Sequence, residues 1–333
     1  MASELRRLLF IRTDRLGETL LNLPAAAALQ AALPGCSVTL LVHPDLEPLL
    51  SGAPGFGVLS VPPGAGGPWW SRAWRLGRAL SPRRFDAALV SNPKQELHAA
   101  VWLAGIPVRV GYNRKWGCLL THRLDDRKAL GDRHEVESNL DLVRALGLPA
   151  QAFPWHFPPF SQEQAEVFRL PEWQGDQSSG PFIAVHPFSS NPVKRWPAER
   201  YRELFRRLAA QAGTRVVVVG GPEERGGVSA VLPPGTPAVN LVGRLTLRQL
   251  AALLQRAQLL ISNDSGPVHL ASAVGTRTVV LFGAAHPAAG PIRWGPWGSG
   301  HAVIAKPSLT DVTVDEVMEA IRRLLDRVDA DVR

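Results

Sequence analysis

The chain has 333 residues and a formal net charge of +8, with 45% hydrophobic and 20% charged residues. Enough apolar side chains are present to fill a core, which excludes a disordered or fibrous protein, and the length predicts two domains of ordinary size. Of the 37 basic residues, 32 are arginine. This positive charge is typical of proteins with polyanionic partners; the alternative is that the arginine content simply follows the composition of the genome. No helix-turn-helix, zinc-finger or RNA-binding motif accompanies it, so we expect no nucleic-acid partner.

The sequence predicts a cytoplasmic protein. Its apolar runs are much shorter than the roughly 20 residues that span a bilayer, and residues 1–7 lack the apolar core of a secretory signal. Cys36 and Cys118 lie far apart and form no CxxC motif. This pattern favours a reducing compartment and argues against a disulfide framework or a zinc site.

In the first half of the chain, short apolar runs alternate with helical patterns. Strands are expected at Leu8–Ile11, Val38–Val42, Val58–Val61, Ala87–Val90 and Val108–Gly111. Helices are expected at Leu16–Leu33, Trp70–Leu80, Gln95–Leu103 and Glu135–Leu146. Such alternation is typical of a parallel sheet that is covered by helices on both faces.

The pattern breaks at residues 147–159, which are rich in proline and aromatic residues and are interpreted as an interdomain linker. We therefore expect two domains, 1–159 and 160–333. In the second, the predicted strands are Phe182–Val185, Arg215–Val219, Leu259–Ser262 and Thr278–Leu281. The predicted helices are Pro197–Ala212, Leu247–Arg256, Pro267–Val274 and a terminal helix at residues 313–328. The expected fold class is α/β, with two doubly wound parallel sheets whose ligand-binding edges face a shared cleft.

The segment Ile261–Ala271 combines a buried strand, a polar turn and the start of a helix. Pro267 suits the first helical position, and Ser265 or Asp264 suits the cap before it. A helix that starts at the carboxyl end of a parallel strand presents unpaired N–H groups, which bind anions. The segment therefore predicts a phosphate site, with an ordinary capped helix as the alternative.

A second polar loop, "HPFSSNPVKRWP", also follows a predicted strand and precedes a predicted helix. Ser189 and Ser190 offer hydroxyl and backbone N–H groups, and Lys194 is a compact cation that suits a diphosphate. Taken alone, a solvated lysine is the simpler interpretation. Beside the first phosphate site, the loop indicates a second part of the same site.

The third segment, "RTDRLGETL", joins the first predicted strand to the first predicted helix. It has one glycine and lacks the GxGxxG pattern of NAD- or FAD-binding proteins. Gly17 permits close approach to the backbone, and Glu18 places a carboxylate at the end of the sheet. The alternatives are that Asp14 caps the helix and that Glu18 provides a favourable charge in its first turn.

Together the segments "RTDRLGETLLNLPA", "HPFSSNPVKRWPAERY", "ISNDSGPVHLASAVGTRTVVLFG" and "WGPWG" resemble glycosyltransferase family 9, the bacterial ADP-heptose:lipopolysaccharide heptosyltransferases. The resemblance covers nearly the whole chain. It implies a GT-B fold and an inverting mechanism without a metal ion or a cofactor. It also implies that the C-terminal domain holds most of an ADP-heptose donor and that the acceptor is the inner core of lipopolysaccharide.

The resemblance also assigns roles to individual residues. Glu18 stands at the position of the catalytic carboxylate, where the family usually has Asp, so its carboxylate reaches roughly 1.5 Å further; Asp14 is the fallback. Lys194 matches the phosphate-binding lysine. The remaining implied donor-binding residues are Ser189, Ser190, Asp264, Ser265, Gly266, His269 and one of Glu223 and Glu224, the last of these for the ribose hydroxyls.

Residues 68–78 alternate tryptophan with arginine. One hypothesis is contact with an anionic acceptor or with the inner leaflet, which implies a lipid-linked or phosphorylated glycan as partner and a peripheral position on the inner membrane. The alternative is that the tryptophans pack beneath a solvated basic helix. No residue of an acceptor site is selected by the sequence.

Other functions remain compatible with these segments. The same chemistry with another nucleotide sugar or another glycoconjugate is the nearest. A nucleotide-sugar epimerase and a nucleotide-sugar-binding protein without catalysis are the more distant alternatives.

Overall fold

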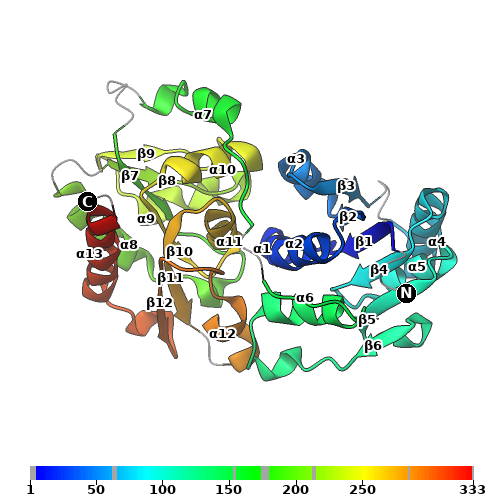
Figure 1. Ribbon diagram of the computed structural model, residues 1–333. Helices are drawn as coiled ribbons and strands as arrows, with labels where there is room; N and C mark the ends of the chain where they lie inside the picture. The colour runs from blue at the N-terminus through cyan, green and yellow to red at the C-terminus, as the bar shows by residue number, and fades with distance from the viewer. Residues whose placement is uncertain are drawn as a thin grey trace. The chain divides into compact units, whose positions relative to one another are not determined.

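The computed structural model describes residues 5–61, 66–152, 155–173, 180–211, 215–283 and 286–331. The chain divides into two compact units, Met1–Trp155 and His156–Arg333. In Figure 1 the first unit runs from blue to green and the second from green to red.

The first unit is built on one parallel sheet of six strands in the order β3-β2-β1-β4-β5-β6. The strands are β1 (Arg7–Ile11), β2 (Ser37–Val42), β3 (Phe56–Ser60), β4 (Ala87–Val90), β5 (Val108–Tyr112) and β6 (His122–Leu124). The strand order reverses between β1 and β4. In open sheets of this kind, ligands bind beside such a switch point at the carboxyl ends of the strands.

Helices cover both faces of this sheet, as the sequence predicted. They are α1 (Leu16–Leu20), α2 (Leu23–Ala32), α3 (Glu47–Leu50), α4 (Trp69–Leu80), α5 (Gln95–Leu103) and α6 (Glu135–Arg144). Figure 1 shows α2 and α6 on one side of the strands and α4 and α5 on the other. Because both faces are covered, the central strands are apolar along their length, and all four residues of β4 are buried.

The single helix predicted over Leu16–Leu33 is wrong, because the chain breaks between α1 and α2. Pro24 has no N–H group to donate to the carbonyl four residues before it, which interrupts the helical hydrogen bonds. The side chain of Asn22 donates to the carbonyl of Glu18 over 2.8 Å. The break leaves Glu18 in a helix of one turn directly after β1.

The second unit repeats the topology of the first. Its parallel sheet has the order β12-β11-β10-β7-β8-β9. The strands are β7 (Phe182–His186), β8 (Arg215–Val218), β9 (Ala238–Asn240), β10 (Leu259–Asn263), β11 (Arg277–Gly283) and β12 (His301–Lys306). Numbered from its own first strand, this order equals that of the first sheet and is the order found in dinucleotide-binding folds. The switch point lies between β7 and β10.

The helices of the second unit are α7 (Ser161–Val167), α8 (Ala198–Ala209), α9 (Val228–Val231), α10 (Leu247–Arg256), α11 (Gly266–Ala273), α12 (Pro291–Trp294) and α13 (Val314–Asp331). The bounds predicted for α10, and for α5 in the first unit, are confirmed without change. Within the described residues, no helix is both long and apolar enough to cross a lipid bilayer.

The segment 147–159, which we interpreted as a linker, is partly attached to both units. The chain divides after Trp155, four residues earlier than expected. The Trp155 ring packs against Phe56 of the first unit, with ring centres 5.9 Å apart. Phe157 N–H donates to the carbonyl of Ala273 in the second unit over 2.9 Å. The aromatic residues therefore serve as packing residues of the two units.

A buried amide ties the loop after β7 to the end of β10. Asn263 is fully buried, and its Oδ1 accepts hydrogen bonds from Trp196 N–H and from the Tyr201 hydroxyl at 3.1 and 3.0 Å. Its Nδ2 donates to the carbonyl of Pro187 over 2.9 Å. Burial also raises the pKa of Tyr201. One side chain thus satisfies polar groups that the core would otherwise leave without partners.

We expect Tyr201→Phe to lower the free energy of unfolding by about 1 kcal/mol, because the amide oxygen keeps Trp196 N–H as a partner. Asn263→Leu leaves several buried polar groups without partners, so it is expected to lower the stability by about 3 kcal/mol. Urea unfolding measures both changes. Equal losses in the two variants would contradict the role given to Asn263.

Candidate functional site

The donor residues predicted from sequence lie in three loops that follow three neighbouring strands of the second sheet. These strands are β10, β7 and β8, in that order across the sheet. The loops contain Ser189, Ser190 and Lys194 after β7, Glu223 and Glu224 after β8, and Asp264 and Ser265 after β10. Because the strands are parallel, their carboxyl ends lie at the same edge of the sheet. The switch point between β7 and β10 opens at this edge.

An ion pair joins the loop after β7 to the loop after β10. The ammonium of Lys194 contacts Oδ2 of Asp264, and the two side chains are 30% and 10% exposed. Burial raises the pKa of Asp264, and the ammonium offsets this effect only in part. The pair therefore holds a cation, accessible from solvent, beside the first turn of α11.

The sequence offered Ser265 or Asp264 as the cap of α11. The structure places Ser265 at the cap position, but its side chain forms no capping hydrogen bond. Its Oγ lies instead 2.9 Å from Oγ of Ser262 and 3.2 Å from Nδ1 of His186. Gly266 is the first helical residue. The backbone N–H groups of this turn are therefore not covered by a capping side chain.

His186, which the sequence analysis did not assign, connects all three loops. It ends β7 and is buried, with Nδ1 3.3 Å from Ser262 Oγ and Nε2 3.3 Å from Oε2 of Glu224. An ionised carboxylate only accepts hydrogen bonds, so Nε2 carries the proton in this contact. The available signal was a polar residue at the end of an otherwise apolar strand.

Glu224 and Glu223, the two alternatives for the ribose, occupy different environments. Oε2 of Glu224 accepts the N–H of Gly221 over 2.8 Å in addition to its contact with His186. Burial alone would raise the pKa of Glu224, but the hydrogen bond and the charge of His186 lower it. Glu223 is exposed to solvent. The structure thus connects Glu224, and not Glu223, to the other site residues.

Three further predicted donor residues, Ser189, Ser190 and His269, have different surroundings. Ser189 is buried, and its Oγ accepts the N–H of Asn191 over 3.3 Å while its carbonyl accepts Nε–H of Arg195 over 2.7 Å. Its side chain therefore shapes the loop. Ser190 is exposed. His269 is buried in α11, one turn after the cap.

In the first unit, Asp14 is held by a buried arginine. Nε of Arg12 lies 2.7 Å from Oδ1 of Asp14, and NH1 lies 3.0 Å from Oε1 of Glu135. Burial would lower the pKa of Arg12, but the two carboxylates outweigh it and raise that pKa. The predicted capping role of Asp14 is wrong, because the cap position belongs to Arg15 and has no side-chain hydrogen bond.

Glu135 accepts a second cation from another segment. It is fully buried, and its Oε1 lies 2.6 Å from Nζ of Lys128. The same ammonium lies 4.4 Å from the centre of the Tyr112 ring. Sequence reasoning placed Glu135 only as the start of a helix, because nothing local indicates partners so distant along the chain.

Glu18, the predicted catalytic residue, lies in the first turn of α1 and is half-buried. Within the described part of the chain, its carboxylate forms no hydrogen bond or ion pair. Asp14, the fallback, is committed to Arg12. Glu18 is therefore the better placed of the two to accept a proton from a substrate.

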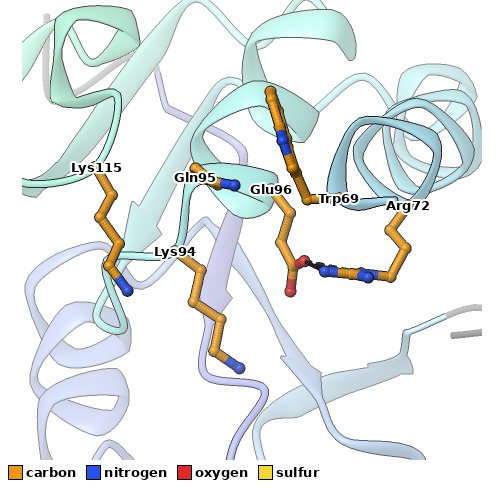
Figure 2. Close-up of a pocket in the computed structure, with 6 residues that line it drawn as sticks. All are labelled: Trp69, Arg72, Lys94, Gln95, Glu96 and Lys115. Atoms are coloured by element: carbon orange, nitrogen blue, oxygen red, sulfur yellow. Dashed lines mark hydrogen bonds and ion pairs between the residues drawn. The ribbon is translucent and has the colours of Figure 1, made fainter. Parts of the chain in front are cut away.

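A pocket of about 420 Å³ lies between the N-terminal ends of α4 and α5 and the loop after β5. It is lined by Trp69, Arg72, Lys94, Gln95, Glu96 and Lys115. Arg72 is paired with Glu96 over 2.5 Å. In Figure 2, Lys94 and Lys115 extend in the same direction from two different segments. Neither ammonium has an ion pair among the described residues, so the pocket suits an anionic group.

For residues 68–78, one interpretation was that the tryptophans pack beneath a basic helix. This interpretation is wrong for two of these tryptophans. Trp70 is 62% exposed and Trp74 is 52% exposed. Among the described residues, no group of three or more His, Cys, Asp or Glu side chains is placed to hold a metal ion.

Residues 73–315 match the model of glycosyltransferase family 9 (heptosyltransferase). The chain belongs to glycosyltransferase family 9. It is 25% identical to lipopolysaccharide heptosyltransferase 2 of Escherichia coli (strain K12), over 96% of this chain and 98% of that protein. The resemblance stated from the sequence motifs is confirmed, and the protein is a glycosyltransferase.

Two solved structures show that the fold is shared. A family 9 glycosyltransferase from Veillonella parvula superposes with a TM-score of 0.87 at 21% identity, covering 98% of this chain and 99% of that one. The ADP-heptose lipopolysaccharide heptosyltransferase II of E. coli superposes with a TM-score of 0.80 at 24% identity, covering 97% and 99%. The predicted α/β class and GT-B fold of this family 9 protein are thereby confirmed.

The ion pair of Lys194 makes the stability of the protein depend on pH. In Lys194→Ala, the Asp264 carboxylate stays buried without its cation, so its pKa in the folded state rises further above the unfolded value of 3.8. We expect a loss of about 2 kcal/mol at neutral pH. The loss shrinks as the pH falls through the raised pKa, because protonation removes the buried charge.

Chemical unfolding of the wild type and Lys194→Ala over a pH series measures this difference. Lys306→Ala is the matched control, because Lys306 pairs with Glu316 while both side chains are more than a third exposed. That variant should lose clearly less stability than Lys194→Ala, because solvent screens an exposed ion pair. A loss in Lys194→Ala that does not change with pH would contradict the account of Asp264.

Proposed function

We propose that this family 9 enzyme transfers heptose from ADP-heptose to the inner core of lipopolysaccharide, with inversion at the anomeric carbon and without a metal ion. The observation that carries the proposal is the junction of three loops at the switch point of the second sheet. There, His186 and Lys194 link Glu224, Asp264 and Ser265. The name of the E. coli relative supports the choice of ADP-heptose as donor.

The second unit would hold the nucleotide part of the donor. Lys194 and the N–H groups of Ser265 and Gly266 would contact the diphosphate, because a compact cation and the first turn of a helix both stabilise phosphate oxygens. Oε2 of Glu224 is already engaged by His186 and Gly221. Its Oε1 would therefore accept hydrogen bonds from the ribose hydroxyls.

In the proposed reaction, Glu18 removes the proton from an acceptor hydroxyl while the oxygen of that hydroxyl attacks the anomeric carbon. The new carbon–oxygen bond forms on the face opposite the nucleotide, and the bond to the diphosphate breaks with its electron pair. ADP leaves, and the configuration is inverted. Lys194 and the helix N–H groups stabilise the negative charge that develops on the departing diphosphate.

The acceptor would be an anionic, lipid-linked glycan at the cytoplasmic face of the inner membrane. The pocket at the N-terminal ends of α4 and α5 supports this proposal, because Lys94 and Lys115 present two cations there. Carboxylate or phosphate groups of a core oligosaccharide match this charge. Trp69 and Arg72 of this pocket belong to residues 68–78, for which the sequence suggested an anionic acceptor as one hypothesis. The sequence did not select any individual residue of an acceptor site.

The direct test is to incubate the protein with a panel of nucleotide sugars and delipidated core acceptors and to determine the masses of the products. Formation of a heptosylated acceptor from ADP-heptose supports the proposal. Transfer of another sugar would change the donor, and release of an epimerised sugar without an acceptor would contradict glycosyl transfer.

Glu18→Gln should lower the rate of transfer by about 10²–10⁴-fold, because the amide cannot take the proton. The dissociation constant for ADP should stay within about twofold, since no nucleotide contact is proposed for Glu18. Steady-state kinetics and calorimetry measure the two quantities. Glu18→Asp keeps a carboxylate and should retain measurable transfer. Wild-type turnover in Glu18→Gln would show that another residue is the base.

Glu224→Gln should weaken ADP binding about tenfold, because a hydrogen bond to a charged acceptor is replaced by a neutral one. Glu223→Gln removes the same charge one residue earlier from an exposed side chain and should leave ADP binding unchanged. Calorimetric titration with ADP compares the pair. The reverse order of effects would assign the ribose to Glu223.

A further inference from the structure

The first unit exposes large apolar side chains on α4, on α5 and in the loop after β5. Five of them are between 45% and 62% exposed: Trp70, Trp74, Trp102, Leu103 and Trp116. We call these residues the tryptophan face. Scattered single apolar residues are normal at a protein surface, whereas a group of them marks an interaction site.

The tryptophan face is centred on the outer side of α4. Trp70 and Trp74 are four residues apart and therefore lie one turn apart on the same side of this helix. The opposite side, which includes Leu76 and Leu80, is buried in the core against the sheet. In Figure 1, α4 lies at the outer edge of the first unit. The sequence of α4 thus places apolar residues on two sides of the helix. One side is buried in the core, and the other is exposed.

Residues of α5 adjoin this face because the two helices approach closely at Gly77. A Cβ atom at Gly77 would lie 2.9 Å from Cβ of Leu103 and 3.1 Å from the carbonyl of Ala100. Leu103 and its neighbour Trp102 therefore lie beside the C-terminal half of α4. The close packing fixes the position of these exposed side chains.

Trp116 lies beside the N-terminal end of α4. Its ring contacts that of Trp69, with ring centres 4.7 Å apart. The backbone of Lys115 and Trp116 has φ values of 40° and 68°. This left-handed conformation is rare for bulky residues and is strained. The fold therefore tolerates strain in the segment that presents Trp116 to solvent.

The charge around the tryptophan face is positive. Residues 48–85 contain no Asp or Glu, but they contain five arginines. The guanidinium of Arg78 lies 5.0 Å from the centre of the Trp74 ring. Arg75 lies on the same helix, half-buried, and its guanidinium donates to the carbonyl of Gly66 over 3.1 Å. Arginine beside exposed tryptophan fits a surface that carries phosphate groups above an apolar layer.

We propose that the tryptophan face docks the protein onto an anionic phospholipid bilayer, with tryptophans at the level of the headgroups and Arg75 and Arg78 on lipid phosphates. Tryptophan favours this interface because its ring is largely apolar while its N–H group is polar. The inference rests on the proposed function, because it assumes that the acceptor is anchored in a membrane. Trp69 and Arg72 of the same helix line the acceptor pocket, so docking through α4 brings the pocket close to a membrane-bound glycan.

Co-sedimentation with vesicles tests the proposal. The probes are vesicles of phosphatidylcholine alone and vesicles that also contain phosphatidylglycerol. The wild type should bind the anionic vesicles, and added salt should release it. Trp70→Ala/Trp74→Ala should weaken binding at least tenfold. Arg75→Glu/Arg78→Glu should weaken it by a similar factor and reduce the dependence on salt.

Matched controls carry the same chemical changes in the second unit. Ile292→Ala removes an apolar side chain that is 63% exposed. Arg322→Glu/Arg323→Glu reverses two charges on exposed side chains of α13. Both controls should bind vesicles as the wild type does. Circular dichroism and the affinity for ADP should be unchanged in all variants, which shows that they are folded.

Each remaining outcome supports or overturns the proposal. Absence of vesicle binding by the wild type, or equal binding by the tryptophan variant, overturns it. A dimer of the wild type that Trp70→Ala/Trp74→Ala dissociates, without vesicle binding, assigns the face to a second copy of the chain. Failure of ADP binding by the wild type would contradict the proposed function and leave vesicle binding unaffected, so the two failures are distinguishable.

Discussion

The imidazole of His186 connects the loops that follow three neighbouring parallel strands, and the geometry of the candidate donor site depends on this connection. Its two nitrogens contact Ser265 on one side and Glu224 on the other. Lys194 and Asp264 add a second link between two of the same loops. Loops at the end of a sheet have few backbone partners of their own, so side-chain contacts of this kind determine where they lie.

The two units share a strand order but differ in the chemistry at their switch points. In the second unit, the partly exposed ion pair of Lys194 and Asp264 lies beside the start of α11, which no side chain caps. In the first unit, the cations are neutralised internally, since Arg12 and Lys128 both contact the buried carboxylate of Glu135. Removing that carboxylate would leave Arg12 with Asp14 alone and take from Lys128 its ion pair with Glu135. Loss of one partner of a buried ion pair is strongly destabilising in proteins. On the same fold we therefore propose a phosphate site in one unit and a catalytic carboxylate, Glu18, in the other.

The first unit also separates its two kinds of surface along α4 and α5. Their N-terminal ends carry the cationic pocket, and their outer sides carry exposed tryptophans. An enzyme that acts on a membrane-anchored glycan needs both an anion-binding pocket and a way to remain near the bilayer. Placing them on the same two helices couples their positions, because helices that pack on one sheet move as a rigid group.

The sequence by itself determined the buried strands, several helix bounds and the family, because apolar periodicity and short motifs are local properties. It missed the edge strands β6, β9 and β12, whose residues are only partly buried and form no continuous apolar run. Only the tertiary structure brought Glu224 into contact with His186, directed the side chain of Ser265 away from the N-terminus of α11, and paired Arg12 with Glu135, 123 residues further along the chain. These outcomes depend on side chains that the sheet brings together from distant segments, and no local pattern encodes such contacts.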